Sequence, residues 1–255
     1  LPKTAWPPTY NQTALVNGYS FTPEKWSLEA YQYIASEWAT IGRAYLMTIL
    51  VTVIGTALSL VITSTFAFVV SNDKLPGHKI LMFLCIFTML FNGGLVASYY
   101  VYSNIFHIKN TIWALIVPTF LMSPFNVVLV KNYFSNSISP SILEAARMDG
   151  AGVFAVFTKI VMPLSVPIMA TVGLMTAIGY WNDWTNGLYY LTENGGSQYY
   201  TIQLVLNRIN ENINFLANNS DVAAKAAQQL PSTTMRMAIA VIGILPIMCA
   251  YPFFQ

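Results

Sequence analysis

Charged side chains are scarce in this sequence. Asp, Glu, Lys and Arg make up 9% of the 255 residues, whereas a soluble domain carries roughly 25%. Hydrophobic residues make up 55%, and so few charges could not cover so many apolar side chains in water. The net charge of +2 is too small to indicate nucleic acid or another polyanion as a partner. We therefore expect a protein of the lipid bilayer, and neither a disordered chain nor a soluble domain.

Residue types that hold metals or catalyse reactions are also rare. The two cysteines, Cys85 and Cys249, lie in apolar stretches, and the two histidines, His78 and His107, are far apart in the sequence. Neither HExxH nor a Cys–His ligand spacing occurs, so we expect no disulfide framework and no metal site. Isolated histidines also provide no nucleophile and base for a membrane enzyme. The phosphate-binding sequence Gly-x-x-x-x-Gly-Lys-Ser/Thr is missing as well, and we do not expect this chain to hydrolyse ATP.

Long charge-free runs dominate what remains. A helix that crosses a bilayer needs about 20 mostly apolar residues. Five runs without Asp, Glu, Lys or Arg meet this need: residues 44–72, 80–108, 110–130, 160–182 and 237–255. The sequence therefore predicts an all-α, polytopic membrane protein with five transmembrane helices. In the two longest runs we place the helices at Tyr45–Val70 and Ile80–Tyr102.

The positive-inside rule orients these helices. Lysine and arginine are denser in segments 71–79 and 131–163 than in the other connecting segments. We therefore expect these two segments in the cytoplasm. Residues 1–40 then form an external N-terminal segment before a transmembrane domain over 41–255. Residues 184–231 form a polar external loop rich in Asn, Gln and Tyr.

The second cytoplasmic segment has the pattern of a helix, a glycine turn and a second helix. Ser139 or Ser141 can cap the first helix, and with Ser141 as the cap Glu144 takes the capping-box position. Gly150 or Gly152 can end that helix in the left-handed conformation that other residues resist. The sequence therefore predicts a short helix outside the bilayer.

Two adjacent small residues, Ala145 and Ala146, are the unusual feature of this helix. Small side chains let another surface approach closely, and Glu144, Arg147 and Asp149 flank them with charges that fix the register. We interpret the helix as a docking helix. An ordinary cytoplasmic helical hairpin fits the spacing equally well.

The same residues carry a resemblance to a known family. The run Glu144-Ala145-Ala146-x-x-Asp149-Gly150-Ala151, followed by Pro163-Leu164-Ser165-x-Pro167, resembles the EAA motif of ABC importer permeases. Segments 88–94, 179–184 and 237–255 are similar to signatures of the carbohydrate-importing permeases. The resemblance is to the oligosaccharide and polygalacturonan-type subgroup, relatives of the smaller permease of the maltose importer, and it extends over nearly the whole chain.

This resemblance implies a permease subunit of an ATP-driven, binding-protein-dependent importer for a carbohydrate, in particular an oligosaccharide, in the bacterial cytoplasmic membrane. The implied partners are a second homologous permease, a cytoplasmic ATPase dimer that binds ATP and Mg²⁺, and an extracellular sugar-binding lipoprotein. No cofactor is expected in this chain itself. The resemblance also implies that six residues of segment 135–163 couple the permease to the ATPase: Glu144, Ala145, Ala146, Arg147, Asp149 and Gly150. Family members have six spans, so we expect a further span before Leu1 and a short basic tail after Gln255.

Two groups of residues are candidates for the sugar path, because sugars present hydroxyl groups and flat apolar faces. They combine uncharged hydrogen-bonding groups with aromatic rings: Asn92, Gly93 and Gly94, and Tyr180, Trp181, Asn182, Asp183 and Trp184. The adjacent glycines also predict a break in the second helix. The alternative to a sugar path is a purely structural role. The aromatic residues would then anchor helices at the membrane interface, and the glycines would let helices pack closely.

The external loop is the expected contact for the binding protein. Its Asn and Tyr residues suit adaptable hydrogen bonding at an interface, and we assign Tyr199 and Asn207 to that contact. A solvated loop without a partner is the alternative.

A secondary sugar transporter, not driven by ATP, is the competing hypothesis. Ion-coupled transporters place ionisable groups near the middle of the bilayer. None of the five runs contains a charged residue, and the nearest acid, Asp183, stands at the outer end of the fourth run. The sequence therefore favours the ATP-driven importer.

Overall fold

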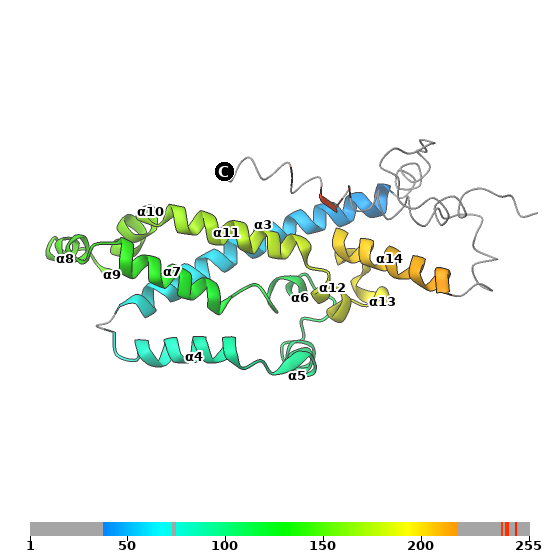
Figure 1. The fold of residues 1–255 in the computed structure, drawn as a ribbon, viewed down its shortest axis with the longest axis horizontal. Helices are drawn as coiled ribbons and strands as arrows, with labels where there is room; N and C mark the ends of the chain where they lie inside the picture. Colours follow the sequence, from blue (N-terminus) through cyan, green and yellow to red (C-terminus); the bar gives the residue numbers. More distant parts are fainter. Residues whose placement is uncertain (1–37, 73–74, 219–240, 242, 245–247, 249–255) are drawn as a thin grey trace, which may run out of the picture.

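The structure, a computed structural model, describes residues 38–72, 75–218 and positions 241, 243, 244 and 248. All regular secondary structure in these residues is helical (Figure 1). The prediction of an all-α chain is confirmed for this part. The expected external segment 1–40 lies outside the described residues except for its last three positions, and the expected span 237–255 is described only at isolated positions.

Helix α3 (Trp38–Ser71) runs along most of the molecule (Figure 1). Its 34 residues correspond to a length of about 50 Å, and Arg43, near its start, is its single charged residue. Helices α11, α7 and α14 pack against it. Thr48 and Ser64 donate hydrogen bonds to carbonyls of the preceding turn, so these two hydroxyl groups are satisfied within the helix itself.

The second expected span is broken at its glycine pair, as predicted. Helix α4 (His78–Leu90) and the segment formed by α5 (Gly94–Tyr100) and η1 (Val101–Ile105) meet at an angle of 118°. Gly94 has a φ of 82°, which glycine adopts without strain. The Asn92 Oδ1 atom accepts a hydrogen bond of 2.9 Å from the Gly94 N–H and stabilises the start of α5.

The run 110–130 does not form the single helix that we expected. Helix α6 (Trp113–Ile116) has only one turn, and α7 (Pro124–Ser137) begins at a proline in its first turn. Proline has no N–H to donate and disfavours helical geometry in the residue before it. The backbone carbonyls freed by the break find donors on other helices: Tyr180 O–H to Ile116 (2.8 Å) and Ser59 O–H to Phe120 (3.0 Å).

The fourth expected span, residues 160–182, is not a single straight helix, because residues 160–164 belong to the helical stretch that follows the segment with the EAA resemblance. Helix α8 (Pro140–Met148) is followed by a continuous helical stretch of α9 (Val153–Val156), η2 (Phe157–Val161) and α10 (Met162–Leu164). Helix α11 (Val166–Asn182) then departs at 78°. By length and composition, the described residues hold one unbroken membrane-spanning helix, Ala39–Ser71, or up to three spans if each bent pair is counted as one.

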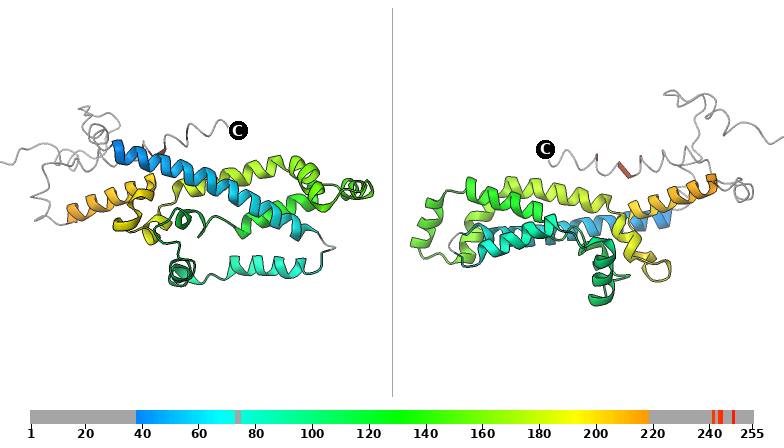
Figure 2. Two further views of the ribbon diagram at one scale, coloured as in Figure 1. Left: turned by 180° about the vertical axis from the view of Figure 1, so that it is seen from behind. Right: turned by 60° about the horizontal axis from the view of Figure 1, so that its bottom comes forward.

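The polar segment after α11 folds at the opposite end of the molecule from α8 (Figures 1 and 2). It comprises α12 (Thr185–Tyr190), α13 (Glu193–Gly196), η3 (Ser197–Tyr199) and the amphipathic α14 (Ile202–Asn218). Ile202 and Leu206 of α14 pack against Ile41 and Ala44 of α3. The Ile202 N–H donates to Thr48 Oγ1 (2.9 Å), so the helix is fixed to α3 by both apolar contact and a hydrogen bond.

The contact of α3 with α11 depends on Gly55. A Cβ atom at this position would lie 2.6 Å from the Tyr180 ring, which is buried and held by its hydrogen bond to Ile116. We predict that Gly55→Ala destabilises the fold by about 1–3 kcal/mol, the usual cost of overpacking a filled core. Thermal unfolding of the purified protein in detergent measures the effect.

Gly152→Ala is the matched control, because a Cβ there meets nothing within 4 Å and φ is −70°. It should leave the unfolding temperature unchanged. Equal unfolding temperatures for the Gly55→Ala and wild-type proteins would show that Tyr180 can move aside.

Candidate functional site

Helix α8 begins after Ser139. This residue has extended backbone angles, and Pro140 occupies the first helical position, where its missing N–H costs nothing. Of the two serines that the sequence allowed as caps, Ser139 takes the N-cap position, but its side chain makes no capping hydrogen bond to the helix. The Ser139 and Ser141 hydroxyl groups bond to each other at 2.8 Å, and Glu144 does not take the capping-box position.

The end of α8 is a tight glycine turn. Gly150 has a φ of 79°, its N–H bonds to the Arg147 carbonyl at 3.1 Å, and the Ala151 N–H bonds to the Ala146 carbonyl at 2.9 Å. This pair of bonds defines the Schellman motif, in which the left-handed residue is usually glycine. The prediction of a left-handed glycine is confirmed at Gly150, whereas Gly152 has an ordinary negative φ.

Helix α8 has one attached face and one free face. Ala146 is buried and Leu143 packs against the same cluster, which includes Phe134 and Ile138 of the α7 region. The rest of the helix surface is exposed and carries the apolar residues Ile142, Ala145 and Met148, together with the charged residues Glu144, Arg147 and Asp149. The two adjacent alanines therefore differ: Ala146 attaches the helix to the bundle, and Ala145 faces outward.

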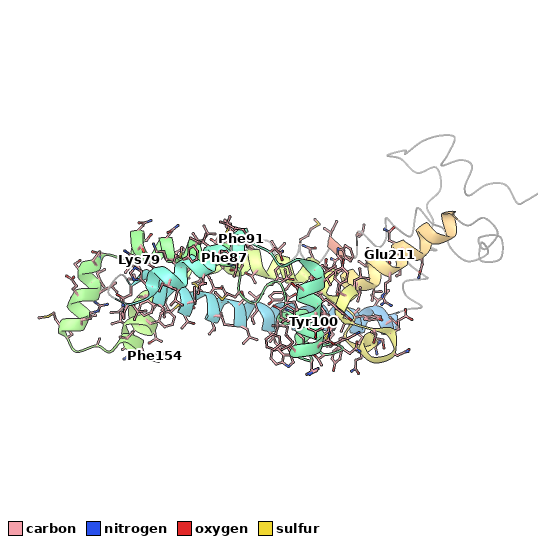
Figure 3. The ribbon with its side chains drawn as sticks, turned by 90° about the horizontal axis from the view of Figure 1, so that it is seen from below. Lys79, Phe87, Phe91, Tyr100, Phe154 and Glu211 are labelled. Atoms are coloured by element: carbon pink, nitrogen blue, oxygen red, sulfur yellow. The ribbon has the colours of Figure 1, made fainter. Side chains whose placement is uncertain are left out.

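The exposed surface continues beyond the glycine turn. Val153 is 71% and Phe154 is 77% exposed, and Figure 3 places Phe154 at the same end of the molecule as α8. These two large apolar side chains begin α9 and lie directly after the polar turn that ends α8. The arrangement suits a partner that approaches along the axis of the bundle from this end.

The candidate path residues in the second span lie at the break between α4 and α5. Asn92, Gly93 and Gly94 are all exposed. The Asn92 side chain accepts the bond from Gly94 that starts α5, so it has a structural role in the bend whatever else it contacts.

The second group of candidate path residues divides between core and surface. Tyr180 is 1% exposed, packs against Gly55 and Phe120, and donates to the Ile116 carbonyl. Trp181 is also buried and donates from Nε1 to the Gly243 carbonyl at 3.3 Å. In this structure both rings contribute to the packing between helices. Because they are buried, neither is accessible to a solute.

The remaining residues of this group lie at the end of α11. Asn182 and Trp184 are exposed. Asp183 accepts hydrogen bonds from the N–H groups of Thr185 and Asn186 and from the Asn186 side chain (2.7 Å). Burial raises the pKa of Asp183 above its ordinary value, and these bonds act against that shift. Asp183 thus fixes the start of α12. Within the described part of the chain, no three His, Cys, Asp or Glu side chains lie close enough together to hold a metal ion.

The two residues assigned to the binding protein lie at the end of the molecule that carries α12 to α14. Tyr199 is half-buried and packs against the cluster that contains Tyr180. Asn207, on α14, donates to Glu211 at 3.0 Å, and Figure 3 shows Glu211 projecting at the end opposite Phe154. The structure therefore puts both residues at the end expected outside the cell.

Asn110 is a structural residue that the sequence reasoning missed. It has a φ of 59°, and its side-chain oxygen accepts hydrogen bonds from the Thr192 N–H (2.7 Å) and hydroxyl group (3.1 Å). Gly195 and Gly196 lie so close to it that a Cβ on either would meet the amide within 3 Å. The available signal was the residue type, because asparagine tolerates positive φ better than most other residues.

Comparisons with known proteins agree on one family. The family model for the binding-protein-dependent transport system inner membrane component matches residues 54–255. The polygalacturonan/rhamnogalacturonan transport system permease protein YtcP of Bacillus subtilis (strain 168) is 36% identical over 233 residues, which cover 91% of this chain and 79% of that protein. Protein LplC of the same organism is 35% identical over 91% of this chain and 76% of its own length.

The fold has a solved counterpart. A chain from the crystal structure of a bacterial ABC transporter involved in the import of the acidic polysaccharide alginate superposes with a TM-score of 0.79. It is 28% identical, and the match covers 95% of this chain and 84% of the other. With the family match over residues 54–255, these likenesses show that the chain belongs to the family of binding-protein-dependent transport system inner membrane components.

Proposed function

We propose that the chain is one of two permeases of an ATP-driven importer that takes up an oligosaccharide. The observation that carries the proposal is helix α8, which holds the EAA residues at an exposed end of the bundle and ends in the Gly150 turn. Family membership and carbohydrate-transporting relatives support it. Its partners would be a second homologous permease, a cytoplasmic ATPase dimer and an extracellular sugar-binding lipoprotein.

The free face of α8 is suited to the ATPase. Ala145 has no side-chain atoms beyond Cβ, so a cleft can close around the helix at this point. The exposed apolar side chains of Ile142 and Met148, three residues before and after it, would be removed from water on docking, which favours binding. Glu144 and Arg147 can pair with charges at the rim of such a cleft. ATP and Mg²⁺ would be bound by the ATPase, since this chain has no phosphate-binding loop.

A secondary transporter was the alternative from the sequence, and three observations count against it. Its ion coupling would need an ionisable group within the bilayer, whereas the charge-free runs provide none. It would also have no use for an exposed apolar face on α8 outside the membrane. The family, moreover, consists of components that act with a binding protein.

The names of the relatives support a carbohydrate as the substrate. They are linked to polygalacturonan and rhamnogalacturonan in one case and to alginate in the other. We therefore propose oligosaccharides of this kind as the first compounds to test for uptake. Exposed Asn182 and Trp184 at the outer end of α11, and Asn92 at the bend, are the proposed contacts along the path.

Replacing Gly150 tests the coupling role. A β-branched residue resists the left-handed conformation by roughly 1–2 kcal/mol, so Gly150→Val should distort the end of α8 and lower sugar uptake by about tenfold or more. Insertion of the protein into the membrane should be unaffected. Uptake and sugar-stimulated ATP hydrolysis are measured on the complex reconstituted with its partners.

Gly152→Val is the control for this experiment. A Cβ at either glycine meets nothing within 4 Å, and the two positions differ in φ, which is positive only at Gly150. The control should transport normally. Normal uptake and ATP hydrolysis in the Gly150→Val complex would refute the coupling role.

Cross-linking tests the contact with the binding protein. A cysteine at Asn207 that carries a photoreactive label should capture the binding protein in the outward-facing complex, because α14 lies at the expected outer end. Asn136→Cys, an exposed site near α8, makes the same substitution at the opposite end and should capture none. Equal capture from both positions, or none from Asn207, would contradict the assignment.

Two substitutions near the end of α11 distinguish a role in the sugar path from a role in helix packing. Trp184→Ala removes an exposed ring and should raise the KM for sugar uptake several-fold with little change in thermal stability. Tyr180→Phe removes the buried hydrogen bond to Ile116 and should lower the free energy of unfolding by about 1–3 kcal/mol without changing the KM. An unchanged KM in the Trp184→Ala transporter would mean that the path runs elsewhere.

A further inference from the structure

A cavity of about 360 Å³ lies between the last turn of α3, the start of α4 and the middle of α7. Its walls have two chemically different parts. Lys79 and Lys131 provide two cations from two different helices, and Met82, Phe83 and Ile86 provide an apolar wall. Lys79 and Phe83 are exposed, so the cavity opens at the surface of the bundle.

As far as the structure describes the lining of the cavity, its charge is positive. The lining residues that the structure describes include no carboxylate. The first turn of α4 contains no acidic residue either, although the start of a helix carries a partial positive charge that favours anions. The cavity therefore attracts an anion, and its apolar wall continues away from the charges along α4.

The position of the cavity restricts which anion fits. Lys79 stands at the end of α4 away from Tyr100 (Figure 3), where α8 also lies (Figure 1). In the orientation that the proposed function requires, this is the cytoplasmic end of the apolar helices. Basic pockets between transmembrane helices on this side suit anionic lipid headgroups. A free phosphate ion would use the lysines and leave the apolar wall without a partner.

We propose that this cavity binds an anionic phospholipid of the cytoplasmic leaflet. The headgroup phosphate is held by Lys79 and Lys131, and an acyl chain lies along Met82, Phe83 and Ile86. The orientation assumed here rests on the proposed function, whereas the binding of the lipid itself can be measured separately from transport. The lipid would fix the start of α4 against α7 at the end of the bundle that carries the docking helix.

The test is lipid retention by the assembled importer. The complex is reconstituted in nanodiscs of equal parts phosphatidylglycerol and phosphatidylcholine, extracted, and analysed by native mass spectrometry. We expect retained phosphatidylglycerol and no retained phosphatidylcholine. Lys79→Gln combined with Lys131→Gln should weaken retention roughly thirty-fold, since each lysine near an anionic headgroup contributes a factor of about five.

Two further variants isolate the site. Lys159→Gln removes the same charge from an exposed position near the same end and should retain phosphatidylglycerol as the wild type does. Ile86→Trp keeps both lysines and fills part of the apolar wall, and it should reduce retention several-fold. Because this variant preserves the charges, it tests the cavity even if the double lysine variant assembles poorly.

Several outcomes would overturn the proposal. Equal retention in the double lysine variant and the Lys159→Gln complex would show that the site is not this cavity. Equal retention of phosphatidylcholine would exclude a role for charge, and complete displacement by inorganic phosphate would identify a soluble anion as the occupant. A wild-type complex that retains phosphatidylglycerol but imports none of the tested oligosaccharides would instead count against the transport proposal, so failure of the two proposals can be distinguished.

Discussion

Backbone polar groups inside a bilayer must find partners within the protein, and this requirement organises the middle of the molecule. The chain between α6 and α7 leaves helical geometry within an otherwise apolar run, and the Ile116 and Phe120 carbonyls accept hydrogen bonds from Tyr180 of α11 and Ser59 of α3. A buried carbonyl left without a donor would cost about 1–3 kcal/mol. The break is therefore stable only while α3 and α11 stand beside it. The same packing requires a glycine at position 55, because the Tyr180 ring occupies the space that a side chain would need.

Successive polar contacts connect Tyr180 to the helices at the outer end of the molecule. Tyr180 fixes the last turns of α11, and Asp183, three residues further on, receives the first N–H groups of α12. Asn186 of α12 then accepts a hydrogen bond of 3.2 Å from the Thr119 hydroxyl group, which connects α12 back to the broken segment. Asn110 holds the turn before α13 in the same way. The residues with the appearance of a sugar-binding signature thus include several whose observed contacts maintain the fold.

The sequence predicted those features of the structure that are caused by residues close together along the chain. The bend at Gly94 and the left-handed turn at Gly150 were predictable, because one residue type tolerates the required φ and its neighbours complete the turn. The break in residues 110–130 was not, because a charge-free run shows only that the segment is apolar. Whether it can leave helical geometry depends on donors such as Ser59, 61 residues away in the sequence. The burial of Tyr180 was missed for a related reason: an aromatic residue near the end of a span has the same local sequence whether it faces lipid, a solute path or Gly55.

The attachment of α8 determines how a force at its free face could reach the rest of the protein. Ala146 and Leu143 pack into the cluster that contains Phe134 and Val156, from α7 and α9. Moving α8 alone would expose these apolar surfaces to water, so α8, the end of α7 and α9 are expected to move as one body. Along the chain, the 78° bend before α11 separates this body from α11. Both α11 and α7 pack against α3, so a displacement of α8 would have to be accommodated at this bend or by movement of α7 along α3.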